Sequence, residues 1–310
     1  MDKKILVLIR EKGQSKYEVG RIVEEGKKKN IEIKVALYKD LKFEIENGKE
    51  KVWIEDELIN QDNFKAVYFR VAGTMDGRYV EARNLLLKLR GDEIKSVNKI
   101  SYLNWPRMGK IAQYGVFVKN DIPVIATKIF YKKEQLRNPF VDKSTSPLDE
   151  GEKFFGWSYP IVVKHEMGYQ GKSVRKIENE EKLGKFLEKI SDKDLGRFMW
   201  QKCLPTKWDI RVIVLGGRGV GAMKRTAGEN EFRSNFSLGG KVENWDLSEL
   251  DKKIAEKVSE VCGLDYCGVD IMKDEEGNSF VLEVNRQCQF RGFEQATGIN
   301  VAEKIVDFLR

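Results

Sequence analysis

Two apolar runs near the C-terminus carry oxygen-bearing side chains at regular spacing. CGVDIM contains Asp270, SFVLEVN contains Glu283 and Asn285, and a turn-forming stretch at 273–278 separates them. Side chains two apart on a strand point to the same face, so Glu283 and Asn285 project together, and Asp270 on the paired strand can join them. Two carboxylates and an amide oxygen suit Mg²⁺. The pattern predicts a magnesium site, although an ordinary hairpin with one polar face would show the same alternation.

A lysine followed by a glycine-rich stretch lies nearer the middle of the chain. An apolar run delivers Lys164, and Gly168 and Gly171 follow it. The N–H groups of a glycine-rich turn can hold a phosphate whose charge the lysine neutralises. The stretch is not a Walker A loop, and a plain hairpin turn is the alternative. His165, the only histidine, alternates with Lys164 and is expected to be structural.

Several charged residues recur on the strands expected between 198 and 285. Asp209 and Arg211 share a face of one strand, and Lys224 and Arg225 lie on the next. Guanidinium groups near a magnesium site can hold anionic oxygens by two hydrogen bonds each, whereas exposed charges on a sheet face are the alternative. The chain has no GxSxG motif and no Cys–His pairing for nucleophilic catalysis. The chemistry would then depend on positioning and charge neutralisation, as in phosphoryl transfer.

The first hundred residues alternate between strand and helix patterns, which predicts a parallel, doubly wound, Rossmann-like sheet. The expected strands are 3–9, 31–38 and 66–70, and the expected helices are 16–29 and 78–89. Asn47 and Gly48 supply the turn of a hairpin expected at 43–54. No GxGxxG follows the first strand, so dinucleotide binding is not indicated.

Asn104-Trp105-Pro106 marks a predicted domain boundary, which gives domains at 1–104 and 105–310, the second divided into about 105–197 and 198–310. In the second domain we expect strand, glycine loop and strand at 159–177 and mostly strands at 198–285. The expected helices are 107–119, 179–190, 248–262 and 300–310. Ser248 and Asp251 form a helix-capping arrangement. The predicted fold class is therefore α/β (α+β).

Composition excludes several classes of protein. Of 310 residues, 41% are hydrophobic and 34% are charged, with Lys and Glu mixed along the chain, which is typical of a folded protein. No apolar run approaches the ~20 residues of a spanning helix, so no membrane partner and a cytoplasmic location are expected. Four scattered cysteines and one histidine argue against a zinc site. The net charge of +7 favours an acidic or phosphorylated ligand, with a Lys-rich surface unrelated to any ligand as the alternative. The sequence has no basic stripe interleaved with aromatic residues, so nucleic-acid binding is not expected.

In this order and spacing, the segments resemble the ATP-grasp superfamily, and within it the RimK-like carboxylate–amine (alpha-L-glutamate) ligases. The matching strings run from about Trp105 to the C-terminus and are DIRVIVLGG, GAMKR, EFRSNFSLGG, GVDIM, LEVN and ATGINVAEKI. The resemblance implies an ATP-grasp fold preceded by a Rossmann-like pre-ATP-grasp domain. It also implies ATP and Mg²⁺ as cofactors, with Mn²⁺ as an alternative metal, and is compatible with a homo-oligomer.

The resemblance also implies a role for each matching residue. The implied metal ligands are Asp270, Glu283 and Asn285. The implied ATP-binding residues are Lys110 and Lys164 at the phosphates, Gly168, Gln170 and Gly171 in the glycine loop, Gln201, Lys202 and Leu204 through their backbone at adenine, and Asp209 and Lys224. The implied catalytic residues, near the γ-phosphate and the acyl phosphate, are Arg211, Arg225, Arg233 and Asn235.

The implied reaction phosphorylates a substrate carboxylate, which an amine then attacks to form an amide. The carboxylate would belong to a protein C-terminus, a peptide or a small molecule, and the amine to an amino acid, with glutamate expected from the family. After LEVN the family continues with small residues and proline, whereas this chain continues with RQCQFRGF at 286–293. The identity of the substrate therefore stays open. The alternative function is a non-catalytic ATP-binding sensor, against which the three retained metal ligands argue.

Overall fold

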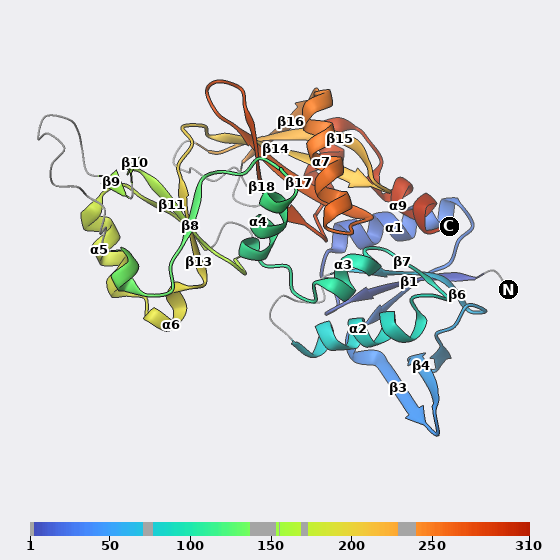
Figure 1. The fold of residues 1–310 in the computed structure, drawn as a ribbon. Helices are drawn as coiled ribbons and strands as arrows, with labels where there is room; N and C mark the ends of the chain where they lie inside the picture. Colours follow the sequence, from blue (N-terminus) through green and yellow to red (C-terminus); the bar gives the residue numbers. More distant parts are fainter. Residues whose placement is uncertain (1–2, 71–76, 137–152, 155, 169–172, 229–239) are drawn as a thin grey trace, which may run out of the picture.

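Three sheets of four or five strands follow one another along the chain and organise the fold (Figure 1). The structure is a computed structural model and describes residues 3–70, 77–136, 153–154, 156–168, 173–228 and 240–310. Within these ranges, no helix combines the length and the apolar character needed to cross a membrane. Smaller sheets of two and three strands flank the larger ones.

The N-terminal sheet is parallel, with the order β2-β1-β6-β7. Its strands are β1 (Lys4–Ile9), β2 (Ile33–Leu37), β6 (Phe64–Phe69) and β7 (Lys95–Ser96). Helix α1 (Lys16–Lys28) packs on one face and α2 (Gly77–Arg90) on the other, because alternate residues of β1 join two different apolar clusters. The predicted Rossmann-like arrangement is confirmed.

A small three-stranded antiparallel sheet follows the short helix η1 (Tyr38–Asp40), and Figure 1 shows its β3–β4 hairpin projecting from the molecule. Its strands are β3 (Leu41–Glu46), β4 (Lys49–Ile54) and β5 (Glu57–Leu58). Asn47 and Gly48 both adopt positive φ, 52° and 72°, as a two-residue hairpin turn requires. The predicted turn is confirmed.

The middle of the chain forms an antiparallel sheet with the order β12-β11-β13-β8. Two helices, α3 (Lys99–Asn104) and α4 (Lys110–Lys119), lead into it. Its strands are β8 (Thr127–Ile129), β11 (Ile161–His165), β12 (Val174–Ile177) and β13 (Phe198–Lys202). Around them lie η2 (Lys133–Leu136), β9 (Lys153–Phe154), β10 (Trp157–Ser158), α5 (Glu180–Glu188) and α6 (Asp192–Leu195). Trp200 and Val163 face the cluster that includes residues of α5, whereas Met199 faces the C-terminal sheet.

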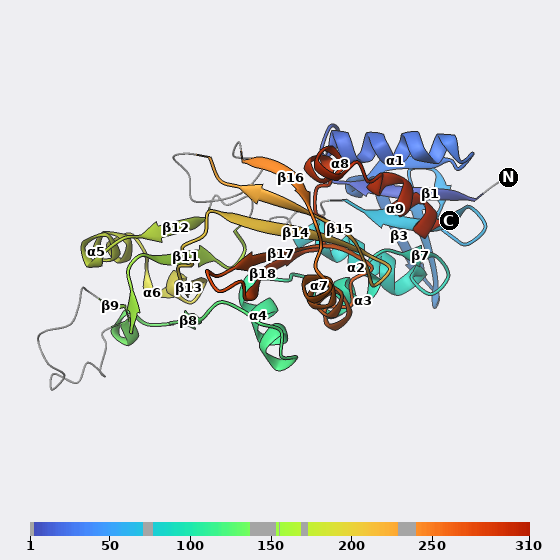
Figure 2. The ribbon, with the colours of Figure 1, turned by 90° about the horizontal axis from the view of Figure 1, so that it is seen from above.

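The C-terminal sheet is antiparallel, with the order β16-β15-β14-β17-β18. Its strands are β14 (Trp208–Leu215), β15 (Arg218–Thr226), β16 (Lys241–Trp245), β17 (Tyr266–Lys273) and β18 (Ser279–Asn285). Helix α7 (Glu249–Val261) packs on it, and the Ser248 side chain caps the helix by accepting from the Asp251 N–H at 3.1 Å. Two helices end the chain, α8 (Arg291–Thr297) and α9 (Val301–Leu309). Figure 2 shows this sheet between the middle sheet and the N-terminal sheet.

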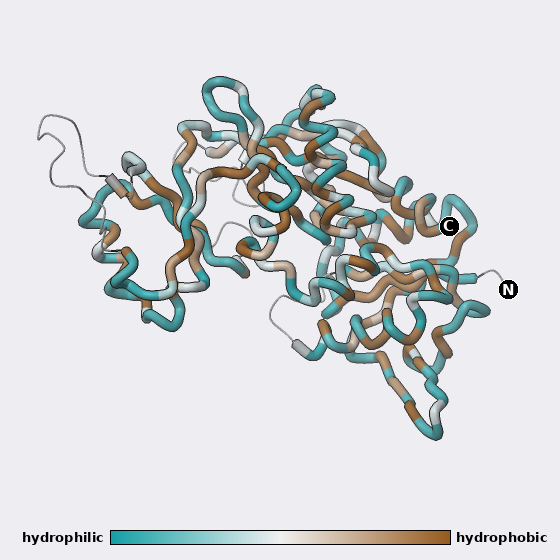
Figure 3. The backbone as a smooth tube through the Cα atoms, in the orientation of Figure 1, coloured by the Kyte–Doolittle hydropathy of each residue, from teal (hydrophilic) through white to brown (hydrophobic). Residues whose placement is uncertain are grey.

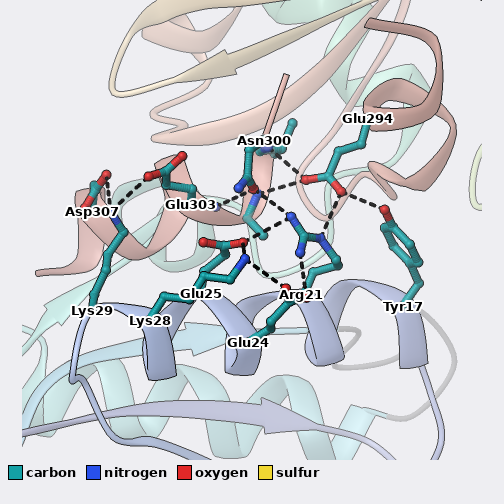
Figure 4. A network of polar contacts seen from close by, with 12 residues as sticks. Tyr17, Arg21, Glu24, Glu25, Lys28, Lys29, Glu294, Asn300, Glu303 and Asp307 are labelled. Atoms are coloured by element: carbon teal, nitrogen blue, oxygen red, sulfur yellow. Dashed lines mark hydrogen bonds and ion pairs between the residues drawn. The ribbon is translucent and has the colours of Figure 1, made fainter. Parts of the chain in front are cut away.

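The N-terminal sheet and the last helices share one apolar core. Ile5 and Val7 of β1 belong to the same buried cluster as Val306 and Leu309 of α9. Figure 3 colours the chain by residue hydropathy and shows hydrophobic segments on both sides of this junction. Polar contacts border the core, where Glu294 accepts from the Tyr17 hydroxyl at 2.7 Å (Figure 4). The predicted boundary falls at the end of α3, but packing continues across it.

Candidate active site

A β-bulge in the pairing of β17 with β18 brings the predicted metal ligands to one face. Asp270 pairs with Glu283, whereas the next residue of β17, Ile271, pairs with Val281. Leu282 is therefore an extra residue in β18. Because of it, Val281 and Val284 both enter the apolar cluster beneath α7, while Glu283 lies beside Asp270.

The three predicted metal ligands lie together. The Asn285 amide Nδ2 lies 3.2 Å from Glu283 Oε1 and 3.4 Å from Asp270 Oδ2. Across the described ranges, no group of three or more His, Cys, Asp or Glu residues is arranged to hold a metal, so Asn285 would have to complete the set. Two carboxylates and an amide oxygen without sulfur or imidazole fit Mg²⁺, which takes its remaining ligands from phosphates and water.

Two arginines hold the carboxylates of neighbouring strands in bidentate pairs. Arg211 lies opposite Asp270 and bonds both its oxygens at 2.7 Å. Arg225 lies opposite Asp209, binds it at 2.6 and 2.8 Å, and reaches Asp270 Oδ2 at 3.0 Å. Burial lowers the pKa of Arg211, but the charge and hydrogen bonds of Asp270, together with smaller contributions from Cys288 and Asp209, raise it overall. The predicted face of alternating charges is present and largely neutralised internally.

Two lysines from outside the C-terminal sheet approach Glu283. Lys110, the first residue of α4, lies 2.9 Å from Glu283 Oε2 and donates to the Gly168 carbonyl at 2.6 Å. Burial raises the pKa of Glu283, but the charge and hydrogen bond of Lys110, the charge of Lys164 and the Asn285 hydrogen bond together lower it to about 2. Glu283 is thus an anion at neutral pH.

Lys164 lies on the face of the middle sheet that looks toward the C-terminal sheet. It pairs with Met199, whose side chain packs among residues of that sheet. Burial lowers the pKa of Lys164 to about 8, with Lys110 acting in the same direction and Glu283 opposing. Within the described ranges, no carboxylate lies at ion-pair distance from it. His165 points the other way, toward Phe198, and its Nδ1 accepts from the Met167 N–H, as expected of a structural histidine.

The segment predicted to contact adenine presents a side chain as well as backbone. Gln201 is buried, and its Nε2 donates to the hydroxyls of Tyr114 and Thr127 at 2.7 and 2.8 Å. Both hydroxyls donate their own protons elsewhere, to Val281 O and Ile125 O, so both must accept from Gln201. The amide orientation is therefore determined, and Oε1 is left buried without a donor among the described residues.

At Gln201 and Lys202, fewer backbone N–H and C=O groups are available to bind adenine than the prediction requires. Gln201 and Lys202 belong to β13, which pairs on both sides, and the Lys202 N–H donates to the Ala126 carbonyl at 3.1 Å. Leu204 follows the end of that strand. The role of this backbone at adenine stays a prediction, and the structure favours Leu204 over the strand residues.

Lys224 is not brought into the cluster. It pairs with Ile210, on the opposite face of the sheet from Asp209 and Arg211, and forms an ion pair with Glu243 at 2.9 Å. Its ammonium lies 5.3 Å from the ring centroid of Trp208. The family resemblance implied a role at the nucleotide for both Lys224 and Arg225, but adjacent strand residues point to opposite faces. Four other predicted residues lie outside the described ranges: Gln170, Gly171, Arg233 and Asn235.

Sequence reasoning missed Gln113, which bonds to the edge strand that carries Glu283 and Asn285, two of the predicted metal ligands. On α4, Gln113 accepts from the Val284 N–H at 2.9 Å and donates to the Val284 carbonyl at 3.2 Å. Val284 separates Glu283 from Asn285, so this pair of bonds positions both. A glutamine within a helix pattern gives no signal of such a contact, because only the tertiary packing reveals its partner.

An antiparallel sheet that carries carboxylates and arginines, facing a second antiparallel sheet that carries a buried lysine, is the arrangement expected of the ATP-grasp class. The sequence pattern of the RimK-like ATP-grasp domain matches residues 109–309, and the chain belongs to this family.

Two curated relatives show how far the sequence likeness extends. Beta-citrylglutamate synthase B of Danio rerio is 32% identical over 170 residues, covering 54% of this chain and 41% of that protein. A probable alpha-L-glutamate ligase of Psychromonas ingrahamii is 42% identical over 101 residues, 33% of each chain. The chain thus spans between about a third and two fifths of the length of these relatives.

A solved structure, the ATP-grasp ligase PsnB complexed with a minimal precursor, shows the same fold. It superposes with a TM-score of 0.74 at 20% identity, covering 100% of this chain and 99% of that one. The same ligase has also been solved with precursor, Mg and ADP. At this identity the likeness concerns the fold, and it extends over both the N-terminal sheet and the ATP-grasp part.

Proposed function

We propose that the chain is an ATP- and Mg²⁺-dependent ligase that joins a carboxylate to an amine through an acyl phosphate. One observation carries the proposal: Asp270, Glu283 and Asn285 lie together between the arginine pairs of the C-terminal sheet and two lysines from the middle of the chain. Family membership and the names of the relatives, which are synthases and ligases, support the same reaction class.

In the proposed first step, a substrate carboxylate oxygen attacks the γ-phosphorus of ATP and ADP leaves. Lys110 and Lys164 would neutralise phosphate oxygens, and Asp270, Glu283 and Asn285 would hold the metal. When bound, Mg²⁺ would supply positive charge against the phosphate oxygens. The arrangement has the fixed cations that stabilise developing negative charge without reorganising.

In the proposed second step, an amine nitrogen attacks the acyl carbon, the carbon–oxygen bond to phosphate breaks, and the amine loses a proton. Arg211 and Arg225 would stabilise the acyl phosphate and the departing phosphate. Their bidentate pairs with Asp270 and Asp209 keep both guanidinium groups in place before substrate arrives. No side-chain nucleophile is needed in either step.

For the substrates, we propose an amino acid such as glutamate as the amine and a protein, peptide or metabolite as the carboxylate. The names of the relatives support glutamate, and the precursor complex of PsnB supports a peptide acceptor. We place the reaction in the cytoplasm, with Mn²⁺ as a substitute metal to be tested.

The test is an ADP-release assay with Mg²⁺ and ATP, in which single amino acids are added to a cell extract as acceptor. We expect release that requires both an amine and an acceptor, together with a product whose mass shift identifies the added unit. ATP binding by calorimetry without turnover for any pair would instead support the sensor alternative.

Replacing Glu283 with glutamine should reduce turnover by at least about a hundredfold, because the change removes a charged metal ligand. The fold should persist, as shown by an unchanged circular dichroism spectrum. Glu57→Gln is the matched control, since Glu57 pairs with Lys4 and Lys34 in the N-terminal domain, away from the site. Near-normal turnover in Glu283→Gln would contradict the metal assignment.

A further inference from the structure

The two central strands of the N-terminal sheet, β1 and β6, meet at a topological switch point at their carboxyl ends, where the connections leave toward opposite faces of the sheet. These strands are neighbours, but β1 leads to α1 on one face of the sheet and β6 is followed by α2 on the other. The connections therefore diverge at this point. In open parallel sheets, ligands bind outside the carboxyl ends of strands where the connections diverge in this way. The candidate active site does not use this switch point.

Arg70 lies at the switch point, immediately after β6, and is fully buried. It donates to the Cys288 carbonyl at 3.2 Å, and its contacts to Ser15 Oγ and the Tyr68 hydroxyl are long, at 3.4 and 3.5 Å. Its Nε has no partner among the described residues. No described carboxylate lies at ion-pair distance, and the Glu18 charge acts on it from farther away. A buried cation without a close counter-charge is costly, so an incoming anion would be favoured here.

The N-terminus of α1 adds positive potential at the same point. Ser15, which Arg70 contacts, precedes this 13-residue helix with φ of 51°, and its side chain does not cap the helix. The first N–H groups of an uncapped helix, together with the helix dipole, attract negative groups. Two independent features, a guanidinium with an unused donor and an uncapped helix, thus converge at Ser15.

One residue separates the switch point from the arginine of the active site. Cys288 bonds Arg70 through its carbonyl, and on its other side its Cβ lies 2.9 Å from the position that a Cβ on Gly268 would take. The Arg211 side chain lies 3.2 Å from that same position. Arg70 and the Arg211 side chain therefore both lie close to Cys288.

We propose that Arg70 and the N-terminus of α1 form an anion subsite for a substrate carboxylate that does not itself react. This proposal rests on the proposed ligase function, because it assigns one end of the substrate to the switch point while the other end reacts beside Arg211. The carboxylate comes either from the acid that is phosphorylated or from the amino acid that supplies the amine. Both sources present the same chemistry to a guanidinium.

Two pairs of probes, used with the full chain, Mg²⁺ and a non-hydrolysable ATP analogue, distinguish the sources. L-glutamate is compared with its α-amide as amine, and glutarate with its monoamide as acid. Calorimetry should show that the wild type binds the free carboxylate at least about tenfold more tightly than the amide in one pair, as a lost charge-assisted hydrogen bond implies. The pair that shows this preference identifies the source.

Arg70→Gln should bring that ratio close to one, and Arg70→Lys should retain part of it, while affinity for the ATP analogue stays unchanged. Arg83→Gln is the matched control, because Arg83 is also buried in the N-terminal domain, bonded to Pro106 O and stacked on Tyr102. Retention of the ratio in Arg70→Gln, or no preference in either wild-type pair, would overturn the subsite. If Arg70→Gln removes the preference but the wild-type chain shows no turnover, the subsite would be upheld and the proposed ligase activity would be rejected.

Discussion

At the scale of single residues, the candidate site balances its charges before any ligand is present. Asp270 is shared by Arg211 and Arg225, and Glu283 is held by Lys110. Lys164 differs, since burial lowers its pKa and no described carboxylate pairs with it closely. Its charge is thus the one that an incoming phosphate would stabilise most.

Wild-type affinity for ATP should fall as the pH rises from about 7 to about 9, because Lys164 loses its proton near its pKa of about 8. Bound phosphate favours the charged lysine, so the protonated form binds more tightly. Lys164→Met should weaken binding by roughly tenfold at about pH 7 and flatten the dependence. Calorimetry at both pH values measures this, with Lys185→Met on the exposed face of α5 as control. A pH dependence that survives in Lys164→Met would assign it to another group.

Gln201 should select the base of the nucleotide if adenine binds where the family pattern places it. Its amide presents only an acceptor, Oε1, which suits the 6-amino group of adenine and opposes the 6-oxo group of hypoxanthine. ATP should bind about tenfold more tightly than ITP, and Gln201→Met should remove most of that difference. The exposed Gln135→Met is the control. Equal affinities for ATP and ITP in the wild type would show that Oε1 faces no base.

At the scale of elements, the packing of β17 requires a glycine at position 268, where β17, β14 and the segment after β18 meet. A Cβ on Gly268 would lie 2.9 Å from Cys288 Cβ and 3.2 Å from Arg211 Cδ, both tighter than ordinary packing. The strand therefore needs glycine for the chain after β18 to pass close to it. This contact links the position of Arg211 to the segment in which the chain departs from the family pattern.

Gly268→Ala should destabilise the protein by about 1–3 kcal/mol through overpacking and should lower turnover by displacing Arg211. Gly184→Ala is the control, because a Cβ on Gly184 in α5 would meet nothing within 4 Å and alanine favours a helix. Thermal unfolding and the ADP-release assay measure the two effects. Wild-type stability and turnover in Gly268→Ala would show that Cys288 moves aside freely.

Elements with a regular alternation of hydrophobic and polar residues, or with a characteristic turn sequence, were predictable from the sequence. Contacts between elements far apart along the chain were not. The alternation of VLEVN placed Glu283 and Asn285 on one face, and Asn47-Gly48 predicted its hairpin. Helix α8 was missed, because Gly292 lies within it and it spans only Arg291–Thr297. Gln113 and Arg70 were also missed, since their partners lie far along the chain and only packing brings them together.

At the scale of the whole molecule, the first and last elements stabilise each other. Glu294 accepts from Tyr17 and Arg21 of α1 and also from the N–H groups of Val301 and Ala302 at the start of α9 (Figure 4). One carboxylate thus caps the last helix and joins it to the first. The pre-ATP-grasp domain and the C-terminal part should therefore unfold as one unit.

Glu294→Ala should lower the free energy of unfolding by about 1–3 kcal/mol, because it leaves partly buried donors unsatisfied on both helices. Glu24→Ala, which removes an exposed partner of the same arginine, should have a much smaller effect. Denaturant unfolding followed by tryptophan fluorescence and by circular dichroism should give one coincident transition in both variants. Separate transitions would show that the N-terminal domain is independent.

The extra residue in β18 has a consequence for how this family can change length. Leu282 shifts the alternation of β18 by one residue, so Val281 and Val284 both face the core while Glu283 faces the candidate metal site. Removal of Leu282 would leave a regular strand in which Glu283 still lies opposite Asp270. Removal of Val284 would instead turn Asn285 toward the core, since a strand alternates strictly. Losses of sequence should therefore be tolerated in the 274–278 turn and at Leu282, and excluded between Glu283 and Asn285, whatever side chains stand nearby.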